Sequence, residues 1–149
     1  MSELKEQKIS KILVGVDGSE ESLHALDYAV DAARKYDAEV IALNVILSYV
    51  TIFGPAVPRY MSELKQEAQS YLDKVKEKTK TIGNNRLQLR TEIIESSSAV
   101  SGIVYFAEKE KADLIIVGTR GGSGFRKLLL GSVASGVVIY AHCPVMVVK

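Results

Sequence analysis

The chain alternates between short apolar runs of strand length and longer segments with the period of amphipathic helices. Short runs rich in β-branched residues between polar or glycine residues predict strands. Apolar positions at helical spacing between capping residues predict helices. The predicted strands cover residues 8–16, 39–46, 87–95, 114–117 and 144–148. The predicted helices cover residues 19–36, 62–82, 99–111 and 132–142.

Strands and helices alternate along the chain, which is typical of an α/β fold. Repeated βαβ units require right-handed crossovers and a parallel sheet buried between helices. We therefore predict one doubly wound domain over residues 1–149, in which residues 1–8 form a flexible charged tail. Residues 47–61 lack periodicity and are interpreted as a surface loop, with a ligand lid as the alternative.

Glycines are concentrated after the predicted strand at residues 114–117. They stand at positions 118, 121, 122 and 124, and again at 131, directly before Ser132 and an apolar run that predicts a helix. A glycine loop that leads to a helix N-terminus suits phosphate, because backbone N–H groups can approach the anion and the helix dipole favours it. Two common nucleotide motifs, GxxxxGK[ST] and GxGxxG, are absent from this stretch.

The spacing that remains is Gly118-x2-Gly121-x9-Gly131-Ser132. It resembles the nucleotide loop of the ATP-binding branch of the universal stress protein family. The resemblance extends from KILVGVDGS at residues 11–19 to CPVMVVK at residues 143–149. It implies a Rossmann-like sheet in the order 3-2-1-4-5, similar to the adenine nucleotide alpha hydrolases, with helices on both faces. Asp17 and Gly118 would then lie at the switch point where open α/β sheets bind their ligands.

The resemblance implies two groups of nucleotide-binding residues. The group beside adenine and ribose comprises Gly15, Val16, Asp17 and Val45. The group beside the ribose and the phosphates comprises Val117, Gly118, Gly121, Gly131, Ser132 and Val133. An alternative role for Asp17 is to cap the first predicted helix together with Ser19. Where the family commonly has a further hydroxyl residue, this chain has Ala134.

Three basic residues flank the glycine loop, namely Arg120, Arg126 and Lys127. Their charges are candidates for contacts with phosphate, and simple solvation is the alternative. The resemblance implies Mg²⁺ or Mn²⁺ bound through the phosphates rather than by a protein metal site. The single cysteine, Cys143, excludes an internal disulfide and has no partner for structural zinc.

Composition narrows the possible partners. The 149 residues include 19 basic and 18 acidic side chains, for a formal charge of +1, which argues against nucleic acid or an anionic membrane as a partner. No apolar run approaches the roughly 18 residues of a membrane span. The N-terminus has no apolar signal segment, so we expect a cytoplasmic protein.

The resemblance implies a regulatory homodimer that binds ATP, or alternatively ADP or AMP, and acts in a stress response. Its subunits are expected to pair through the apolar edge strand Val145–Val148. Two other functions remain open. The first is a slow ATPase or phosphotransfer enzyme. The sequence near the loop has no paired carboxylates or activated nucleophile to support it, so no catalytic residue is assigned. A nucleotide-free dimerisation module is disfavoured by the intact glycine spacing.

Overall fold

Five parallel strands form the sheet at the centre of the molecule. A computed structural model of the chain describes residues 3–48, 57–82, 87–119 and 130–149. The strands are β1 (Lys11–Gly15), β2 (Glu39–Leu47), β3 (Gln88–Ser96), β4 (Leu114–Gly118) and β5 (Val145–Val148). Their order is β3-β2-β1-β4-β5, and every neighbouring pair is parallel. This confirms the order implied by the resemblance.

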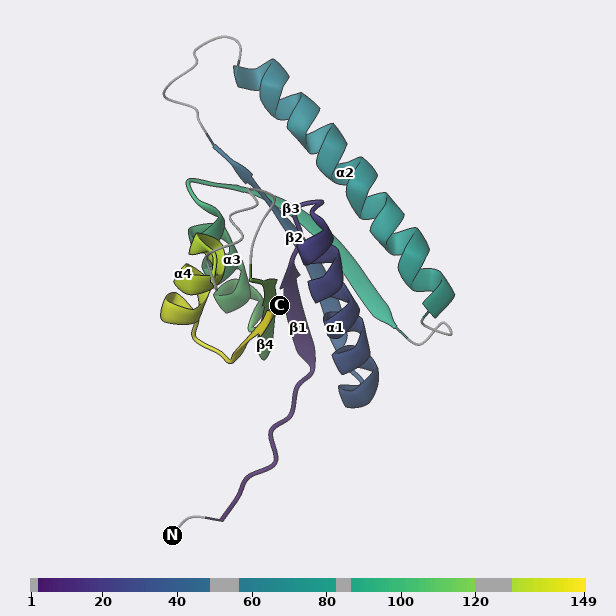
Figure 1. Cartoon of the computed structure of the whole chain (residues 1–149), viewed down its shortest axis with the longest axis vertical. Helices are drawn as coiled ribbons and strands as arrows, with labels where there is room; N and C mark the ends of the chain where they lie inside the picture. Colours follow the sequence, from purple (N-terminus) through teal and green to yellow (C-terminus); the bar gives the residue numbers. More distant parts are fainter. Residues whose placement is uncertain (1–2, 49–56, 83–86, 120–129) are drawn as a thin grey trace.

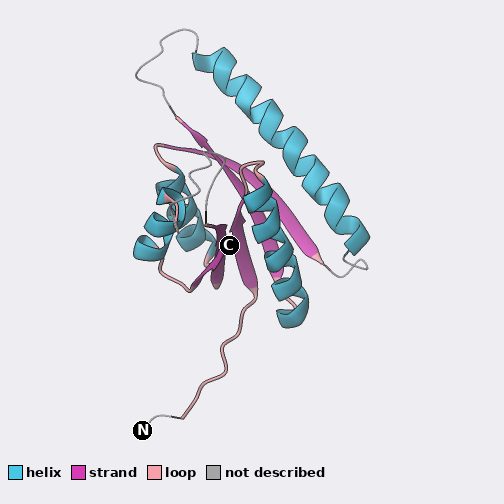
Figure 2. Cartoon of the chain, viewed as in Figure 1, coloured by secondary structure: helices cyan, strands magenta, loops and turns pink. Residues whose placement is uncertain are grey.

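Four helices cover the sheet in pairs (Figures 1 and 2). Helices α1 (Glu20–Tyr36) and α2 (Val57–Ile82) lie on one face, and α3 (Ala99–Glu110) and α4 (Ser132–Tyr140) lie on the other. Alternate residues of each strand serve the two faces, as the pleat of a strand requires. Ile12 and Val14 pack toward α1, whereas Leu13 packs toward α3, and all three are fully buried. The doubly wound α/β fold is therefore confirmed.

Two predicted boundaries change by three residues or more in the structure. Helix α2 begins at Val57 rather than at residue 62. Pro58 had been assigned to a loop, but proline is tolerated in the first turn of a helix, where its missing N–H would have no intrahelical partner. At the other end of that predicted loop, Leu47 is the last residue of β2, and residues 49–56 lie outside the described residues. Strand β1 begins at Lys11 rather than at residue 8, and residues 3–8 are exposed and extend away from the sheet (Figure 1).

Helical spacing predicts an inward face of Val100, Ile103, Val104 and Ala107 for α3, and the structure buries only the second and fourth of these. Val100 and Val104 are only partly buried, and the buried residues of the helix are Gly102, Ile103, Phe106 and Ala107. A Cβ atom on Gly136 of α4 would lie 2.6 Å from Val100 Cγ2. Val100 therefore faces the neighbouring helix rather than the sheet, which explains its partial exposure.

Candidate functional site

The carboxyl ends of β1 and β4 lie side by side where the strand order reverses. Val14 of β1 is in register with Ile116 of β4, so both strands end at the same edge of the sheet. After β1 the chain enters α1 on one face, and the chain after β4 leads to α4 on the other. This divergence is the topological switch point at which doubly wound sheets commonly bind ligands.

The turn from β1 into α1 is held by the side chains of Asp17 and Ser19. Asp17 Oδ1 accepts hydrogen bonds from the backbone N–H of Ser19, at 2.9 Å, and from its hydroxyl. Ser19 is the N-cap of α1, and its Oγ accepts from the N–H of Ser22 at 3.2 Å. Between them, Gly18 has φ +89°, which favours glycine. Asp17 thus stabilises the helix start through Oδ1, while Oδ2 accepts no hydrogen bond from any described residue.

Two of the candidate glycines stand where helices pack against strand ends. A Cβ atom on Gly118 would lie 3.1 Å from the carbonyl oxygen of Glu21 in α1. A Cβ atom on Gly15 would lie 3.3 Å from Cδ1 of Ile103 in α3. Packing alone therefore accounts for both glycines, without an approaching ligand.

The N-terminus of α4 has no side-chain cap. Its N-cap is Gly131, with φ −70° and ψ 167°, and the Gly131 N–H donates to the carbonyl of Thr119, just beyond β4. The first N–H groups of a helix have no intrahelical acceptor. Among the described residues nothing accepts from the N–H of Ser132 or Val133, and both residues are exposed. These donors, with the positive end of the helix dipole, suit an anion.

The other sequence candidates occupy different settings. The side chains of Val16 and Val117 are buried, at 4% and 3% exposure, so only their backbone groups are available for a ligand. Val45 is partly buried and packs close to Gly102 of α3. Arg120, Gly121, Arg126 and Lys127 lie outside the described residues.

A cavity of about 470 Å³ opens at the carboxyl end of β2, beside the β1–α1 turn. It is lined by Asp17 and Gly18, by the last residues of β2, and by Tyr60, Leu64, Glu67, Ala68 and Tyr71 of α2. Asn44 donates from Nδ2 to the carbonyl of Val16 at 2.9 Å, so the side chain joins the ends of β1 and β2. Because that bond uses the amide nitrogen, Asn44 Oδ1 remains as an acceptor.

Tyr71 connects α2 to the β1–α1 turn. Its ring would lie 3.9 Å from a Cβ atom on Gly18, and its hydroxyl is 3.5 Å from Ser22 Oγ. Burial is the main cause that raises the pKa of the Tyr71 phenol. At neutral pH the phenol is therefore protonated and able both to donate and to accept a hydrogen bond.

Sequence reasoning missed Asn44, Glu67 and Tyr71. Asn44 carries a visible signal, since it is the one polar residue within the apolar run IALNVIL. The helical spacing of Tyr71 predicts the inward face of its helix, and the structure packs it against the core, but its position beside Asp17 depends on the tertiary fold. The position of Glu67 in the helical repeat is that of an ordinary solvent-facing residue of an amphipathic helix, so the sequence gives no signal for it.

Residues 8–149 match the model of the universal stress protein family. The chain belongs to this family. It is 44% identical to a universal stress protein of Methanocaldococcus jannaschii in an alignment of 147 residues. The alignment covers 97% of this chain and 84% of the relative. The structure of this chain is similar to that of universal stress protein UspA from Lactobacillus plantarum, with a TM-score of 0.84 and 27% identity. The alignment covers 95% of this chain and 99% of the Lactobacillus chain.

A second solved structure is a universal stress protein in complex with cAMP. Its TM-score to this chain is 0.64 and its sequence identity is 27%. The alignment covers 94% of this chain and 96% of the chain in that structure. The family is thus shown by sequence and by fold, and one of its structural neighbours binds an adenine nucleotide.

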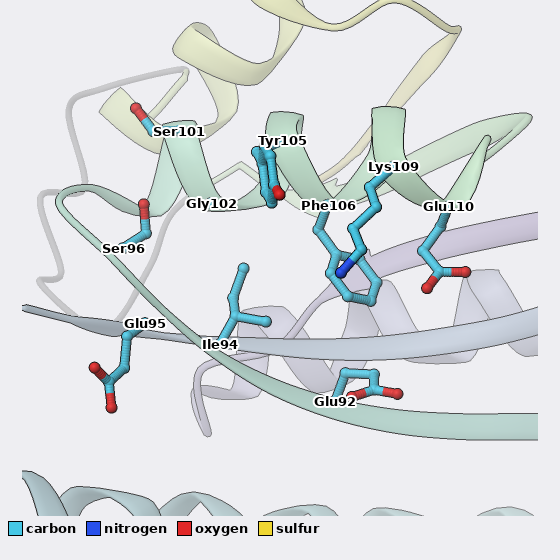
Figure 3. Close-up of a pocket in the computed structure, with 10 residues that line it drawn as sticks. All are labelled: Glu92, Ile94, Glu95, Ser96, Ser101, Gly102, Tyr105, Phe106, Lys109 and Glu110. Atoms are coloured by element: carbon cyan, nitrogen blue, oxygen red, sulfur yellow. The ribbon is translucent and has the colours of Figure 1, made fainter.

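This universal stress protein has another cavity, of about 480 Å³, between α3 and β3 (Figure 3). Its three carboxylates already have partners. Glu110 lies 2.7 Å from Arg90 Nη2 and 3.3 Å from Lys11 Nζ, Glu95 lies 2.7 Å from Lys65 Nζ, and Glu92 lies 3.6 Å from Arg90 Nε. The hydrogen bond from Arg90 is the main cause that lowers the pKa of Glu110. We interpret these groups as a structural charge network rather than a binding site.

The part of the chain that the structure describes contains no cluster of three or more His, Cys, Asp or Glu side chains able to hold a metal ion. Within the same ranges, no helix is long and apolar enough to cross a membrane.

Proposed function

We propose that this universal stress protein binds an adenine nucleotide at the carboxyl edge of its sheet and acts as a cytoplasmic regulatory protein in a stress response. The observation that carries the proposal is the uncapped N-terminus of α4, which offers the free N–H groups of Ser132 and Val133 at the switch point of the sheet. The bound cAMP of a structural neighbour supports adenine as the base.

The two ends of the site suit the two ends of a nucleotide. Phosphates would accept hydrogen bonds from the first turn of α4, where the helix dipole is positive. Adenine and ribose would lie toward Asp17 and Val45, at the ends of β1 and β2. Gly121 would let the loop approach the phosphates, and Arg120, Arg126 and Lys127 would supply positive charge to them.

The ligand is proposed to be ATP, with ADP or AMP as alternatives. A divalent cation, Mg²⁺ or Mn²⁺, would neutralise part of the phosphate charge when bound. This cation would be bound through the phosphate oxygens of the nucleotide. The regulatory signal would be the presence or absence of the nucleotide in the site.

Mass spectrometry of the ligand released from freshly purified protein tests this proposal. An adenine nucleotide should be released, and calorimetric titration of the stripped protein with Mg-ATP should show binding in the micromolar range, about −8 kcal/mol. If no nucleotide is released, and ATP, ADP, AMP and cAMP all fail to bind the stripped protein, the proposal is wrong.

We also propose a homodimer formed through β5. The carbonyls of Pro144 and Val148 face β4, since they accept from the N–H groups of Ile115 and Thr119. Backbone groups alternate in direction along a strand, so the N–H and C=O groups of Val145 and Val147 point away from β4. This unpaired edge is suited to pair with its twin across a two-fold axis.

Exposed apolar residues on α4 and β5 are compatible with the same interface. They are Val138, Ile139 and Tyr140 of α4 and Met146 of β5, which are 48%, 71%, 68% and 38% exposed. Large exposed apolar residues near a strand edge are typical of a protein interface.

The Val147→Pro substitution is expected to weaken the dimer. Proline removes the N–H of Val147 from both copies without removing a bond to β4, and two lost hydrogen bonds correspond to at least about a tenfold weaker association. Analytical ultracentrifugation measures the dissociation constant. Val147→Ala keeps the N–H and is the control. A parent that is monomeric, or a proline variant that dimerises as tightly as the parent, would contradict this interface.

A further inference from the structure

The cavity at the end of β2 has a largely apolar lining that also carries three side chains with hydrogen-bond acceptors. Asp17 Oδ2 and Asn44 Oδ1 accept nothing from the described residues, and the carboxylate of Glu67 adds a third acceptor from α2. The phenols of Tyr60 and Tyr71 complete the polar lining. A group with several O–H or N–H donors satisfies such a lining, whereas an anion is repelled by its carboxylates.

Glu67 differs from the other acidic residues of α2. Glu63 lies 3.6 Å from Arg59, Asp73 accepts a hydrogen bond from Gln69, and Glu77 lies 3.7 Å from Lys80. Glu67 has no such partner among the described residues. The one unpaired carboxylate of the helix is thus also the one that lines the cavity.

The described lining of the cavity carries no positive charge. Among the described residues no lysine or arginine lines the cavity. The sequence of residues 49–56, YVTIFGPA, which joins β2 to α2, contains no basic residue either. The basic candidates Arg120, Arg126 and Lys127 instead follow β4 in the sequence and lead toward α4.

We propose that Glu67 is a specificity-determining residue, which makes the site select nucleotides that carry no additional phosphomonoester on the ribose 2′ or 3′ oxygen. The inference rests on the proposed function, because it assumes that the nucleoside end of the ligand enters the cavity. Glu67 and Asp17 favour the free ribose hydroxyls and repel an additional phosphate. The negative charge of the ligand is thereby confined to the end that faces α4.

The test compares two ligands, AMP and adenosine 3′,5′-bisphosphate, by calorimetric titration at low salt. The parent should bind the bisphosphate at least about tenfold more weakly than AMP, because a dianion would lie near two carboxylates. In Glu67→Gln, which keeps the shape and removes the charge, the ratio should fall to about threefold or less. Glu63→Gln changes an acid on the same helix outside the cavity and should keep the parental ratio.

Each outcome decides the inference. A parent that binds both ligands equally, or a Glu67→Gln variant that keeps the parental ratio, overturns it while the proposed function stands. A parent that binds neither ligand, nor ATP, overturns the proposed function and this inference with it. A ratio that falls equally in Glu63→Gln shows a general effect of helix charge and also overturns the role of Glu67. Melting temperatures of both variants should match the parent, since both positions are exposed.

Discussion

The Gly131→Val variant is expected to bind Mg-ATP at least about a hundredfold more weakly than the parent, because it loses charge-assisted hydrogen bonds of roughly 1.5–3 kcal/mol each. The two added methyl groups would stand at the N-cap of α4, where a phosphate oxygen would approach the N–H groups of Ser132 and Val133. Calorimetric titration of both proteins measures the difference.

The fold should survive this substitution. Gly131 has φ −70°, a conformation that any residue adopts, so the penalty that valine pays at positive φ does not apply. We expect the free energy of unfolding to change by about 1 kcal/mol or less, since glycine gives no side-chain cap that could be lost. Glu108→Gln, at an exposed position of α3 away from the site and the proposed interface, is the control. Equal affinity for Mg-ATP in parent and Gly131→Val would mean that Gly131 only forms a turn.

The Gly118→Val variant is expected to lose about 3 kcal/mol of folding free energy even without a ligand. A Cβ atom at this position would lie 3.1 Å from the carbonyl oxygen of Glu21, which belongs to the backbone of α1 and cannot move independently. The methyl groups of valine increase this overlap and would push the first turn of α1 away from the end of β4.

Urea denaturation measures this effect as a lower midpoint with an unchanged slope. A loss of about 3 kcal/mol also corresponds to a melting temperature lower by roughly 6–12 °C in a chain of this size. Gly118→Ala adds only the first carbon and should cost less. If Gly118→Val is as stable as the parent but fails to bind nucleotide, Gly118 serves the ligand rather than the packing of α1.

The strands and helices could be predicted because their hydrophobic patterns are local. The fully buried strands β1 and β4 are continuous apolar runs, and Ser19 and Ser98 cap α1 and α3 as capping residues should. The order of the strands is set by contacts between distant segments, so it came from the family resemblance. For the buried face of α3, Ile103 and Ala107 are confirmed, whereas Val100 is only partly buried because it packs against Gly136 of another helix, which no helical period reveals.

The site was only partly visible in the sequence. The glycine spacing pointed to the α4 N-terminus, where Gly131 is indeed the N-cap. The same spacing did not reveal that Gly15 allows close packing of α3 against the end of β1, and that Gly118 allows close packing of α1 against the end of β4. The cavity is formed where α2 meets β2, so Asn44, Glu67 and Tyr71 come together only in the folded chain.

A crystal structure of the protein grown with Mg-ATP tests the central proposal most directly. We predict that phosphate oxygens lie within hydrogen-bonding distance, about 2.7–3.2 Å, of the N–H groups of Ser132 and Val133. The adenine and ribose should lie toward Asp17 and the end of β2. A nucleotide bound elsewhere on the molecule, or crystals that contain no nucleotide at saturating Mg-ATP, would contradict the account.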